Sequence, residues 1–250
     1  MFLSPEAVTK SAWLYIAVIG ACISALPPQP APPKEFCEKY NDPPPASSGK
    51  NSSSAVAPQI DYKAARTTFG LKYYPYLFAV WTMTMGTLEA FHTLDLFPQI
   101  MPVGHTPTAR TFNTQLIAGI MLTIASAGLR VAAFHSLGKL FTYHLSIFPE
   151  HKLVTNGVYA YCRHPSYVAT PFIHWGVLLV ITAPGSVLYD YLGVEWMKTL
   201  ITTLGLLVVG VSYVYVGRAE LEDQVLRKEF GKEWEEWARK VPYKFIPYLI

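Results

Sequence analysis

The sequence predicts an all-α, polytopic integral membrane protein with about five transmembrane helices, followed by a cytosolic helical tail at the C-terminus. Three observations lead to this prediction. Apolar residues make up 51% of the chain and charged residues only 15%, which is too apolar for an ordinary soluble domain. Five windows are long and apolar enough to cross a bilayer core of about 30 Å as a helix. Residues 218–242, in contrast, combine a helical apolar stripe with many charges.

The five windows differ in how well they fit a membrane span. They cover approximately Ala12–Leu26, Leu71–Phe91, Phe112–Phe134, Tyr167–Ala183 and Trp196–Gly217. The first is short and ends in small residues, so a transmembrane helix within residues 1–27 competes with a cleaved signal peptide. The fourth contains Pro171 and His174, which a span tolerates where neighbouring helices satisfy the backbone and the imidazole. We therefore expect this pair to face protein.

A Pro/Ser-rich stretch over residues 28–66 separates the first window from the domain of residues 67–250. Its composition is typical of an extended tether without a core of its own. Lys and Arg gather in this tether and its flank, in residues 135–165 and in the tail from residue 218, whereas the alternate loops hold only Lys10 and Arg110. Because cytoplasmic loops carry more positive charge, we expect a cytosolic C-terminus and an unused glycosylation sequon at Asn51.

The composition also excludes several kinds of site. The three cysteines, Cys22, Cys37 and Cys162, form no C-x-x-C pair, so neither a disulfide framework nor a zinc site is indicated, and we expect no metal. The formal net charge of +3 comes without a basic patch interleaved with aromatic residues, so we expect no nucleic-acid partner. A G-x-G turn, which Rossmann-type cofactor sites use, is absent from the sequence.

Residues 135–167 combine turn-forming, histidine, tyrosine and basic residues directly before the fourth window. A loop of this kind is often functional, although an interfacial belt at headgroup depth has the same composition. Asn156-Gly157 indicates a turn, and Pro165 suits the first turn of the fourth helix. The N-terminus of that helix, with Arg163 beside it, is expected to present free N–H groups to an anion.

The tail over residues 218–242 is predicted to be helical and to be split at Gly231. Its apolar residues recur at helical spacing, and they include Leu221, Val225, Leu226, Phe230, Trp234, Trp237 and Val241. One interpretation is an amphipathic helix resting on the membrane, with Trp234 and Trp237 as anchors. Glu222 and Asp223, just after the last window, are carboxylates suited to cationic or hydroxyl-bearing groups.

These two segments together resemble the isoprenylcysteine carboxyl methyltransferase family. The resemblance covers residues 112–250 and rests on L-G-K at 137–139, H-K-L-V-T-N-G-V-Y-A-Y-C-R-H-P-S-Y-V at 151–168 and R-x-x-L-E-D-x-x-L-x-x-x-F-G-x-E-W-x-x-W-x-x-x-V-P at 218–242. It implies a multi-pass enzyme of the endoplasmic reticulum membrane whose active site faces the cytosol. It also implies that residues 67–250 are a membrane methyltransferase domain, with a cofactor pocket formed by residues 135–167 and 218–250.

The resemblance further implies the cofactor, the substrate and the residues that bind them. The cofactor is S-adenosyl-L-methionine, and the acceptor is the C-terminal carboxylate of a prenylated cysteine in CaaX proteins. The positions that match the family's cofactor pocket are His151, Lys152, Leu153, Val154, Gly157, Tyr159, His164, Tyr167, Glu222 and Asp223. Two glutamates are usual at the last two positions, so Asp223 departs from the pattern. Arg163 matches the family's R-H-P-x-Y, and Arg218 matches a basic residue just upstream of the acidic pair.

The chemistry of the acceptor assigns roles to these groups. A terminal carboxylate has a pKa of about 3.5 and is already ionised at neutral pH, so it needs positioning rather than a general base. The planar guanidinium of Arg163 or Arg218 suits that task, and we expect these two to be the catalytic residues. A prenyl chain partitions into the bilayer, so Pro171, Phe172 and His174 are candidates to line a substrate tunnel, unless they only pack helices together.

Two alternatives remain open from the sequence. A phospholipid N-methyltransferase has a similar layout, but its amine acceptor arrives protonated and needs a base such as His144, His151 or His164. Its rate would rise with pH, whereas carboxylate methylation is expected to be nearly flat from about pH 6 to 8. A membrane adaptor without catalytic activity would use the tail as a partner-binding helix and would not bind the cofactor.

Overall fold

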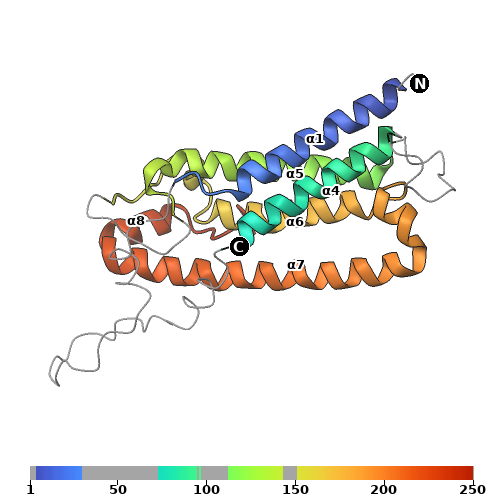
Figure 1. Ribbon diagram of the computed structural model, residues 1–250. Helices are drawn as coiled ribbons and strands as arrows, with labels where there is room; N and C mark the ends of the chain where they lie inside the picture. The colour runs from blue at the N-terminus through green and yellow to red at the C-terminus, as the bar shows by residue number, and fades with distance from the viewer. Residues whose placement is uncertain (1–3, 30–72, 95, 97–111, 143–150, 250) are drawn as a thin grey trace. The chain divides into compact units, whose positions relative to one another are not determined.

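The computed structural model describes residues 4–29, 73–94, 96, 112–142 and 151–249. Every regular element within these ranges is helical, which confirms the all-α prediction (Figure 1). Residues 30–66 of the predicted tether, with its cysteine Cys37 and the Asn51 sequon, lie outside the described residues, as does His144. The chain divides into two compact units, which are described in turn.

The first unit comprises Met1–Leu26, Tyr74–Val131 and Val168–Ser212. It contains α1 (Pro5–Ala25), α4 (Tyr74–Leu94) and parts of three further helices, α5 (Thr114–Leu137), α6 (Pro165–Ile181) and α7 (Val187–Phe230). Each predicted window overlaps one of these five helices. Among the described residues, Pro5–Ala25, Thr114–Leu140 and Val187–Phe230 are long and apolar enough to cross a membrane, and Pro165–Ile181 is a shorter apolar helix. These helices confirm the prediction of a multi-pass membrane fold.

Helix α1 begins seven residues earlier than the hydropathy window predicts. Ser4 caps its N-terminus, with its hydroxyl accepting a hydrogen bond of 3.2 Å from the backbone N–H of Ala7. Pro5 occupies the first helical position and Glu6 lies in the first turn, where both are favoured. These are local capping signals that a hydropathy average does not detect. As a result Lys10, which the window treats as a flanking charge, lies inside the helix and is only 1% exposed.

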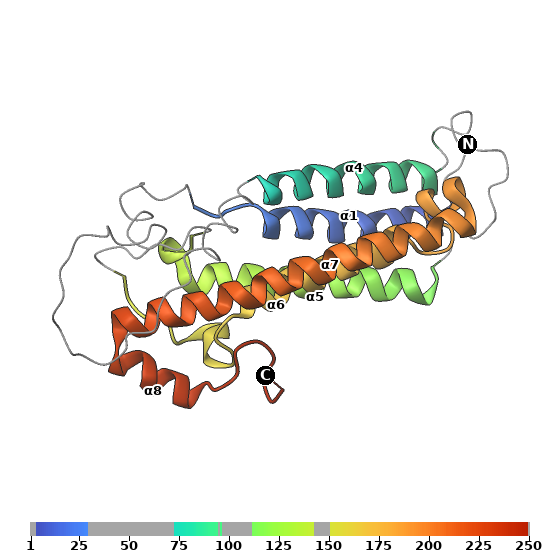
Figure 2. The same ribbon diagram turned by 90° about the horizontal axis from the view of Figure 1, so that it is seen from below.

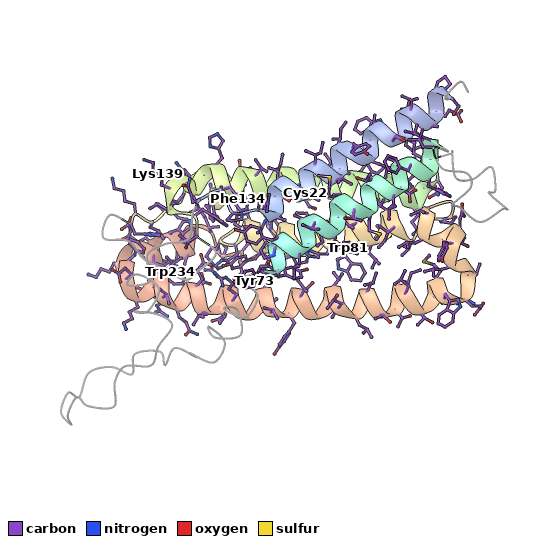
Figure 3. All side chains as sticks on the ribbon, in the orientation of Figure 1. Cys22, Tyr73, Trp81, Phe134, Lys139 and Trp234 are labelled. Carbon is purple, nitrogen blue, oxygen red and sulfur yellow. The ribbon has the colours of Figure 1, made fainter. Side chains whose placement is uncertain are left out.

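Small residues allow the helices of the first unit to approach closely. A side chain at Gly176 of α6 would stand 2.8 Å from the backbone nitrogen of Thr123 on α5, so the contact requires glycine. Helices α1 and α4 lie side by side in both views (Figures 1 and 2). Between them the thiol of Cys22 donates a hydrogen bond of 3.4 Å to the carbonyl of Ala79. Figure 3 labels Cys22 on α1.

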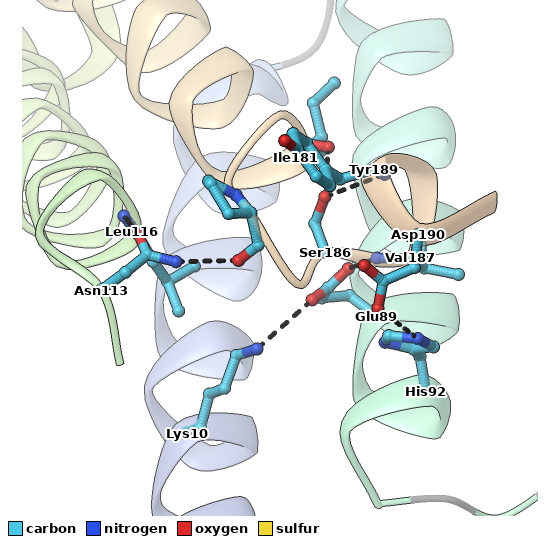
Figure 4. Close-up of polar contacts among 11 residues, drawn as sticks. Lys10, Glu89, His92, Asn113, Leu116, Ile181, Ser186, Val187, Tyr189 and Asp190 are labelled. Atoms are coloured by element: carbon cyan, nitrogen blue, oxygen red, sulfur yellow. Dashed lines mark hydrogen bonds and ion pairs between the residues drawn. The ribbon is translucent and has the colours of Figure 1, made fainter. Parts of the chain in front are cut away.

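Four ionisable side chains lie together at one end of this unit (Figure 4). Lys10 Nζ lies 3.7 Å from Glu89 Oε1, and both side chains are almost completely buried. Glu89 Oε2 accepts a hydrogen bond of 2.7 Å from the backbone N–H of Val187, the first residue of α7. His92 Nε2 lies 3.4 Å from Asp190 Oδ2. This polar cluster connects α1, α4 and α7.

A second buried cation of this unit is Arg130 on α5. Its Nε donates a hydrogen bond of 2.6 Å to the carbonyl of Ser24, and its Nη1 donates to the hydroxyl of Thr170. The carbonyl of Thr170 accepts a bond of 2.6 Å from Nδ1 of His174, and Tyr74 donates to the other ring nitrogen. His174 is 8% exposed, which confirms that it faces protein.

Helix α7 is longer than the predicted fifth window at both ends. It begins at Val187 and bends at Gly193, whose φ of 74° lies in the region that favours glycine. It then continues without a break past Gly217, the predicted end, to Phe230. The charged stretch after residue 217 keeps helical spacing and contains no proline, so nothing in it ends the helix.

The second unit comprises Pro27–Tyr73, Ala132–Tyr167 and Tyr213–Ile250, and only its described residues are discussed. Besides the ends of α5, α6 and α7 it contains η2 (Gly138–Leu140), η3 (Gly157–Ala160) and α8 (Lys232–Lys240). Gly231, with a φ of 51°, separates α7 from α8, which confirms the predicted split. Trp234 and Trp237 of α8 are buried in a cluster with Ala133, Tyr159 and Val241. They are therefore core residues, and the interpretation as membrane anchors is wrong, because this cluster covers the apolar stripe.

Candidate functional site

The candidate site lies in the second unit and begins at the Asn156-Gly157 turn. Gly157 has a φ of 60°, and a Cβ at this position would stand 2.5 Å from Oγ of Ser136 on α5. Both observations require glycine. The turn leads into η3, where the buried Tyr159 accepts a hydrogen bond of 3.2 Å at its carbonyl from Nε1 of Trp237. This contact fixes the segment before α6 against α8.

Arg163 and His164 are held by the chain that follows α8. The N–H of Arg163 donates a hydrogen bond of 3.0 Å to the carbonyl of Tyr243, and the N–H of His164 donates one of 2.8 Å to the carbonyl of Lys244. Pro165, which begins α6 as predicted, has no N–H. The tail carbonyls thus use the two N–H groups that directly precede α6, and within its first turn the N–H of Tyr167 donates to the carbonyl of His164. The expected anion site at this helix N-terminus stays a prediction.

The side chains of the same two residues converge on Asp223 of α7. His164 Nε2 lies 3.0 Å from Asp223 Oδ1, and Arg163 Nη2 lies 3.4 Å from Asp223 Oδ2. All three residues are buried, with exposed fractions of 9% or less. The guanidinium of Arg163 also lies over the ring of Trp234, with its Cζ 5.6 Å from the ring centroid. A buried cation is thus compensated by one carboxylate and one aromatic face.

A second polar chain runs through Tyr167, near the start of α6. The Nε of Arg218 donates a hydrogen bond of 2.8 Å to the hydroxyl of Tyr167. That hydroxyl in turn donates one of 2.5 Å to Oε2 of Glu222. One phenol therefore separates a guanidinium from a carboxylate. The ring of Tyr167 stacks on His164, with centroids 5.5 Å apart, which joins this chain to the Asp223 group.

The remaining predicted cofactor residues lie on the segment that precedes Arg163. Leu153 and Val154 pack against the apolar cluster around Trp234 and Trp237, and Lys152 is exposed. His151 is half-buried, with its ring 6.0 Å from that of Phe230. Burial lowers the pKa of His151 below its ordinary value, and the charges of Glu222 and Glu229 oppose this shift. Burial therefore favours the neutral form of this imidazole.

The predicted substrate residues belong to α6 within the first unit. Phe172 is 38% exposed, whereas His174 is buried against Phe78, with ring centroids 4.2 Å apart. Residues two positions apart on a helix point in nearly opposite directions, so the two side chains do not share a face. His174 makes an interhelical contact, Phe172 remains available to a lipid, and Pro171 is half-buried between them.

Sequence reasoning missed several residues of both units. Tyr243 and Lys244 contribute only their carbonyl groups to the site, and a backbone contact leaves no signal in residue type. Arg130 and the Lys10–Glu89 pair were also missed, although ionisable residues in apolar helices are a known sign of specific partners. Glu89 and Arg130 stand inside or beside predicted windows, and that position was the signal.

Comparisons with known proteins agree with one another. A family model described as the isoprenylcysteine carboxyl methyltransferase (ICMT) family matches residues 119–197, which include Arg163, His164 and Tyr167. A "Probable protein-S-isoprenylcysteine O-methyltransferase" of Oryza sativa subsp. indica is 30% identical over 174 residues, covering 68% of this chain and 76% of the rice protein.

For two further relatives, the matched region covers a smaller share of the relative's own length. "Protein-S-isoprenylcysteine O-methyltransferase B" of Arabidopsis thaliana is 31% identical over 133 residues, which are 52% of this chain and 58% of that protein. "Protein-S-isoprenylcysteine O-methyltransferase" of Homo sapiens is 28% identical over 144 residues, which are 54% of this chain and 43% of the human protein.

Proposed function

The chain belongs to the isoprenylcysteine carboxyl methyltransferase family, and we propose from this premise how its second unit carries out the family's reaction. That reaction is the methyl esterification of the C-terminal carboxylate of a prenylated cysteine, with S-adenosylmethionine as the methyl donor. The observation that supports the assignment best is the pair of hydrogen bonds that connects Arg218 through the hydroxyl of Tyr167 to Glu222. It holds a cation and an anion at fixed positions on either side of one aromatic residue.

The side chains present in this unit fit the cofactor. When bound, S-adenosylmethionine supplies an electrophilic methyl group on a sulfonium cation. The carboxylate of Glu222 and the ring of Tyr167 suit that cation, and Nε1 of Trp234 suits the amino-acid carboxylate. This nitrogen is buried and has no hydrogen-bond partner among the described residues. The other proposed cofactor residues are those that match the family's pocket, namely His164, His151, Lys152, Leu153, Val154, Gly157 and Tyr159. Asp223, which also matches that pattern, contacts His164 and Arg163.

Arg163 and Arg218 are the groups proposed to orient the acceptor carboxylate. The acceptor is ionised at neutral pH, so these residues need only fix one oxygen and leave the other with its lone pairs exposed. Arg218 donates from Nε to the phenol of Tyr167, and Nη2 of Arg163 lies 3.4 Å from Oδ2 of Asp223. Burial strengthens the interaction of either guanidinium with a substrate anion.

The prenyl chain of the substrate is proposed to contact α6. The exposed Phe172 and the half-buried Pro171 offer apolar surface, and His174 supports them from the protein side through its contact with Phe78. A chain that stays in hydrocarbon retains about 0.8 kcal/mol for every buried CH₂ group. The proposed partners are accordingly the prenylated C-terminal cysteines of CaaX proteins together with the bilayer.

We also propose that α1 is retained as a transmembrane helix rather than removed as a signal peptide. Lys10 neutralises the buried Glu89, and Ser24 accepts the hydrogen bond of Arg130. Removing α1 would leave both ionisable groups without these partners. With residues 28–66 as a cytosolic tether and residues 67–250 as the methyltransferase domain, the charge distribution favours a site on the cytosolic face of the endoplasmic reticulum.

A direct assay tests the proposed function. Purified protein in nanodiscs receives radiolabelled S-adenosylmethionine and either N-acetyl-S-farnesylcysteine or phosphatidylethanolamine. We expect base-labile label on the prenylcysteine, a rate nearly flat from about pH 6 to 8, and losses of at least about tenfold in Arg163→Lys and Glu222→Gln. Glu220→Gln, in an exposed pair with Lys244, is the matched control. Label on the phospholipid alone would contradict the proposal.

A further inference from the structure

The two adjacent carboxylates of α7 have different surroundings. Glu222 is half-buried and accepts the hydrogen bond of Tyr167. Asp223 is 5% exposed and is directed to His164 and Arg163. Consecutive side chains leave a helix about 100° apart, so Glu222 and Asp223 point in different directions from α7. The acidic pair is therefore divided between two groups of partners.

Both oxygens of Asp223 are engaged by the segment that carries Arg163. Oδ1 lies 3.0 Å from Nε2 of His164, and Oδ2 lies 3.4 Å from Nη2 of Arg163. The backbone of the same two residues is fixed independently by the carbonyls of Tyr243 and Lys244. The tail thus places the main chain of this turn, and Asp223 places its side chains.

We propose that Asp223 is a positioning residue that fixes the guanidinium of Arg163 and the ring of His164, and that it does not bind the cofactor directly. The inference rests on the proposed function. With Oδ1 as acceptor, the proton of a neutral His164 lies on Nε2, which sets the tautomer of the ring. With Oδ2 beside Nη2, the guanidinium keeps Nε directed elsewhere, and Nε has no hydrogen-bond partner among the described residues.

The length of the aspartate side chain supports this role. The carboxylate lies one methylene closer to α7 than a glutamate carboxylate would, and the segment from Cys162 to Ser166 is buried throughout. A longer side chain at residue 223 would have to displace that segment or turn away from it. Glu222, which has more free surface, does not carry this restriction.

The test compares Asp223→Asn with Glu222→Gln in the full chain in nanodiscs. The readouts are equilibrium binding of S-adenosylmethionine, kcat, and KM for both substrates. For Asp223→Asn we expect cofactor affinity within about threefold of wild type and a fall in kcat on the order of 100-fold, as for a catalytic group displaced by about 1 Å. For Glu222→Gln we expect weaker cofactor binding. Loss of cofactor affinity in Asp223→Asn with kcat retained would overturn the proposal.

A double-mutant cycle with Arg163→Lys separates positioning from a general structural role. If Asp223 acts through Arg163, Asp223→Asn adds less than about twofold to the loss already caused by Arg163→Lys. Fully additive losses would contradict the proposal, as would a wild-type rate in Asp223→Glu. If Asp223→Asn does not fold, cofactor binding by Asp223→Glu decides, because weaker binding there with unchanged kcat marks a direct ligand. Wild-type protein that binds the cofactor but methylates no prenylcysteine would instead refute the proposed function.

Discussion

Tyr167 donates a hydrogen bond of 2.5 Å to Oε2 of Glu222, although the two residues are 55 positions apart in the sequence. The same phenol accepts from Nε of Arg218 at 2.8 Å, so its single proton is directed toward the carboxylate. This direction keeps Glu222 an acceptor. The arrangement gives a specific role to the last residue of the R-H-P-x-Y motif.

Replacing this phenol is expected to impair catalysis without unfolding the protein. Tyr167→Phe removes one donor and one acceptor between two charged groups, and hydrogen bonds to charged groups contribute about 1.5 to 3 kcal/mol. We expect kcat/KM to fall by about 10- to 100-fold in the prenylcysteine assay. Tyr213→Phe, at a residue that is 79% exposed, is the control and should keep wild-type activity. Equal activity in the two variants would contradict a role for the phenol.

Gly157→Ala is expected to destabilise the second unit. The φ of 60° costs an L-residue about 1 kcal/mol, and the added Cβ would stand 2.5 Å from Oγ of Ser136. We expect a lower thermal midpoint in detergent, together with weaker cofactor binding. Gly210→Ala is the matched control, since Gly210 lies in α7 with open space around it and should gain up to about 1 kcal/mol. A midpoint for Gly157→Ala at or above that of wild type would refute the argument.

Lys10→Met is expected to destabilise the first unit by about 3 to 5 kcal/mol, because it leaves Glu89 buried without its cation. The exchanged pair Lys10→Glu with Glu89→Lys should recover only part of this loss. A lysine at position 89 cannot accept the hydrogen bond from the N–H of Val187. Thermal inactivation in nanodiscs measures both effects.

The exposed pair of Lys198 and Glu195 provides the control, and Lys198→Met should have almost no effect. An exchanged pair no more stable than Lys10→Met would show that the ion pair is not the source of stability. Persistence of the N-terminal residues in the mature protein, read by mass spectrometry, would confirm that α1 is retained.

The stability of the second unit is expected to decrease in mildly acidic solution through His151. Burial lowers the pKa of this imidazole from its ordinary 6.5, so the unfolded chain binds a proton that the folded protein does not. Stability is therefore complete above about pH 6.5 and falls as the pH drops below that value. His151→Phe keeps a ring beside Phe230 and should flatten the decline between about pH 7 and 5. The exposed His135, changed to Phe, is the control, and an identical decline in both variants would contradict the assignment.

Cys162 is expected to react slowly with alkylating reagents while the protein is folded. Burial raises the pKa of its thiol from 9.0 to about 11, which lowers the thiolate fraction at neutral pH by about 100-fold. The measurement uses a variant with Cys22→Ala and Cys37→Ala, so that only Cys162 can be labelled. Labelling should become fast on denaturation, and equal rates in folded and unfolded protein would contradict the burial of this thiol.

The sequence predicted the positions of the helices better than it predicted which side chains meet. Hydropathy located α1, α4, α5, α6 and α7, and Gly231 and Pro165 marked helix ends correctly, because these signals are local. The start of α1 was wrong by seven residues because the capping sequence Ser4-Pro5-Glu6 is not apolar. Trp234 was open to a membrane-anchor interpretation because an amphipathic stripe does not say whether lipid or protein covers it.

The candidate site was predictable in its residue types but not in its pairing. The resemblance identified Arg163, His164 and the acidic pair, yet it could not say that Asp223 contacts both of the others. Such a contact joins residues about 60 positions apart in the sequence, and a single sequence does not show which distant residues lie close together in space. The carbonyls of Tyr243 and Lys244 were beyond any prediction from residue type, since every residue carries one.

The contact of Arg163 and His164 with those two carbonyls sets the order in which the site can form during biosynthesis. Tyr243 is translated about 80 residues after Arg163, which takes a ribosome roughly 4 to 16 s at about 5 to 20 residues per second. Throughout that interval the turn before α6 is without these two acceptors for its N–H groups. A nascent chain halted before residue 243 would thus lack both contacts, so this turn reaches its final geometry only after residues 243 and 244 have been translated.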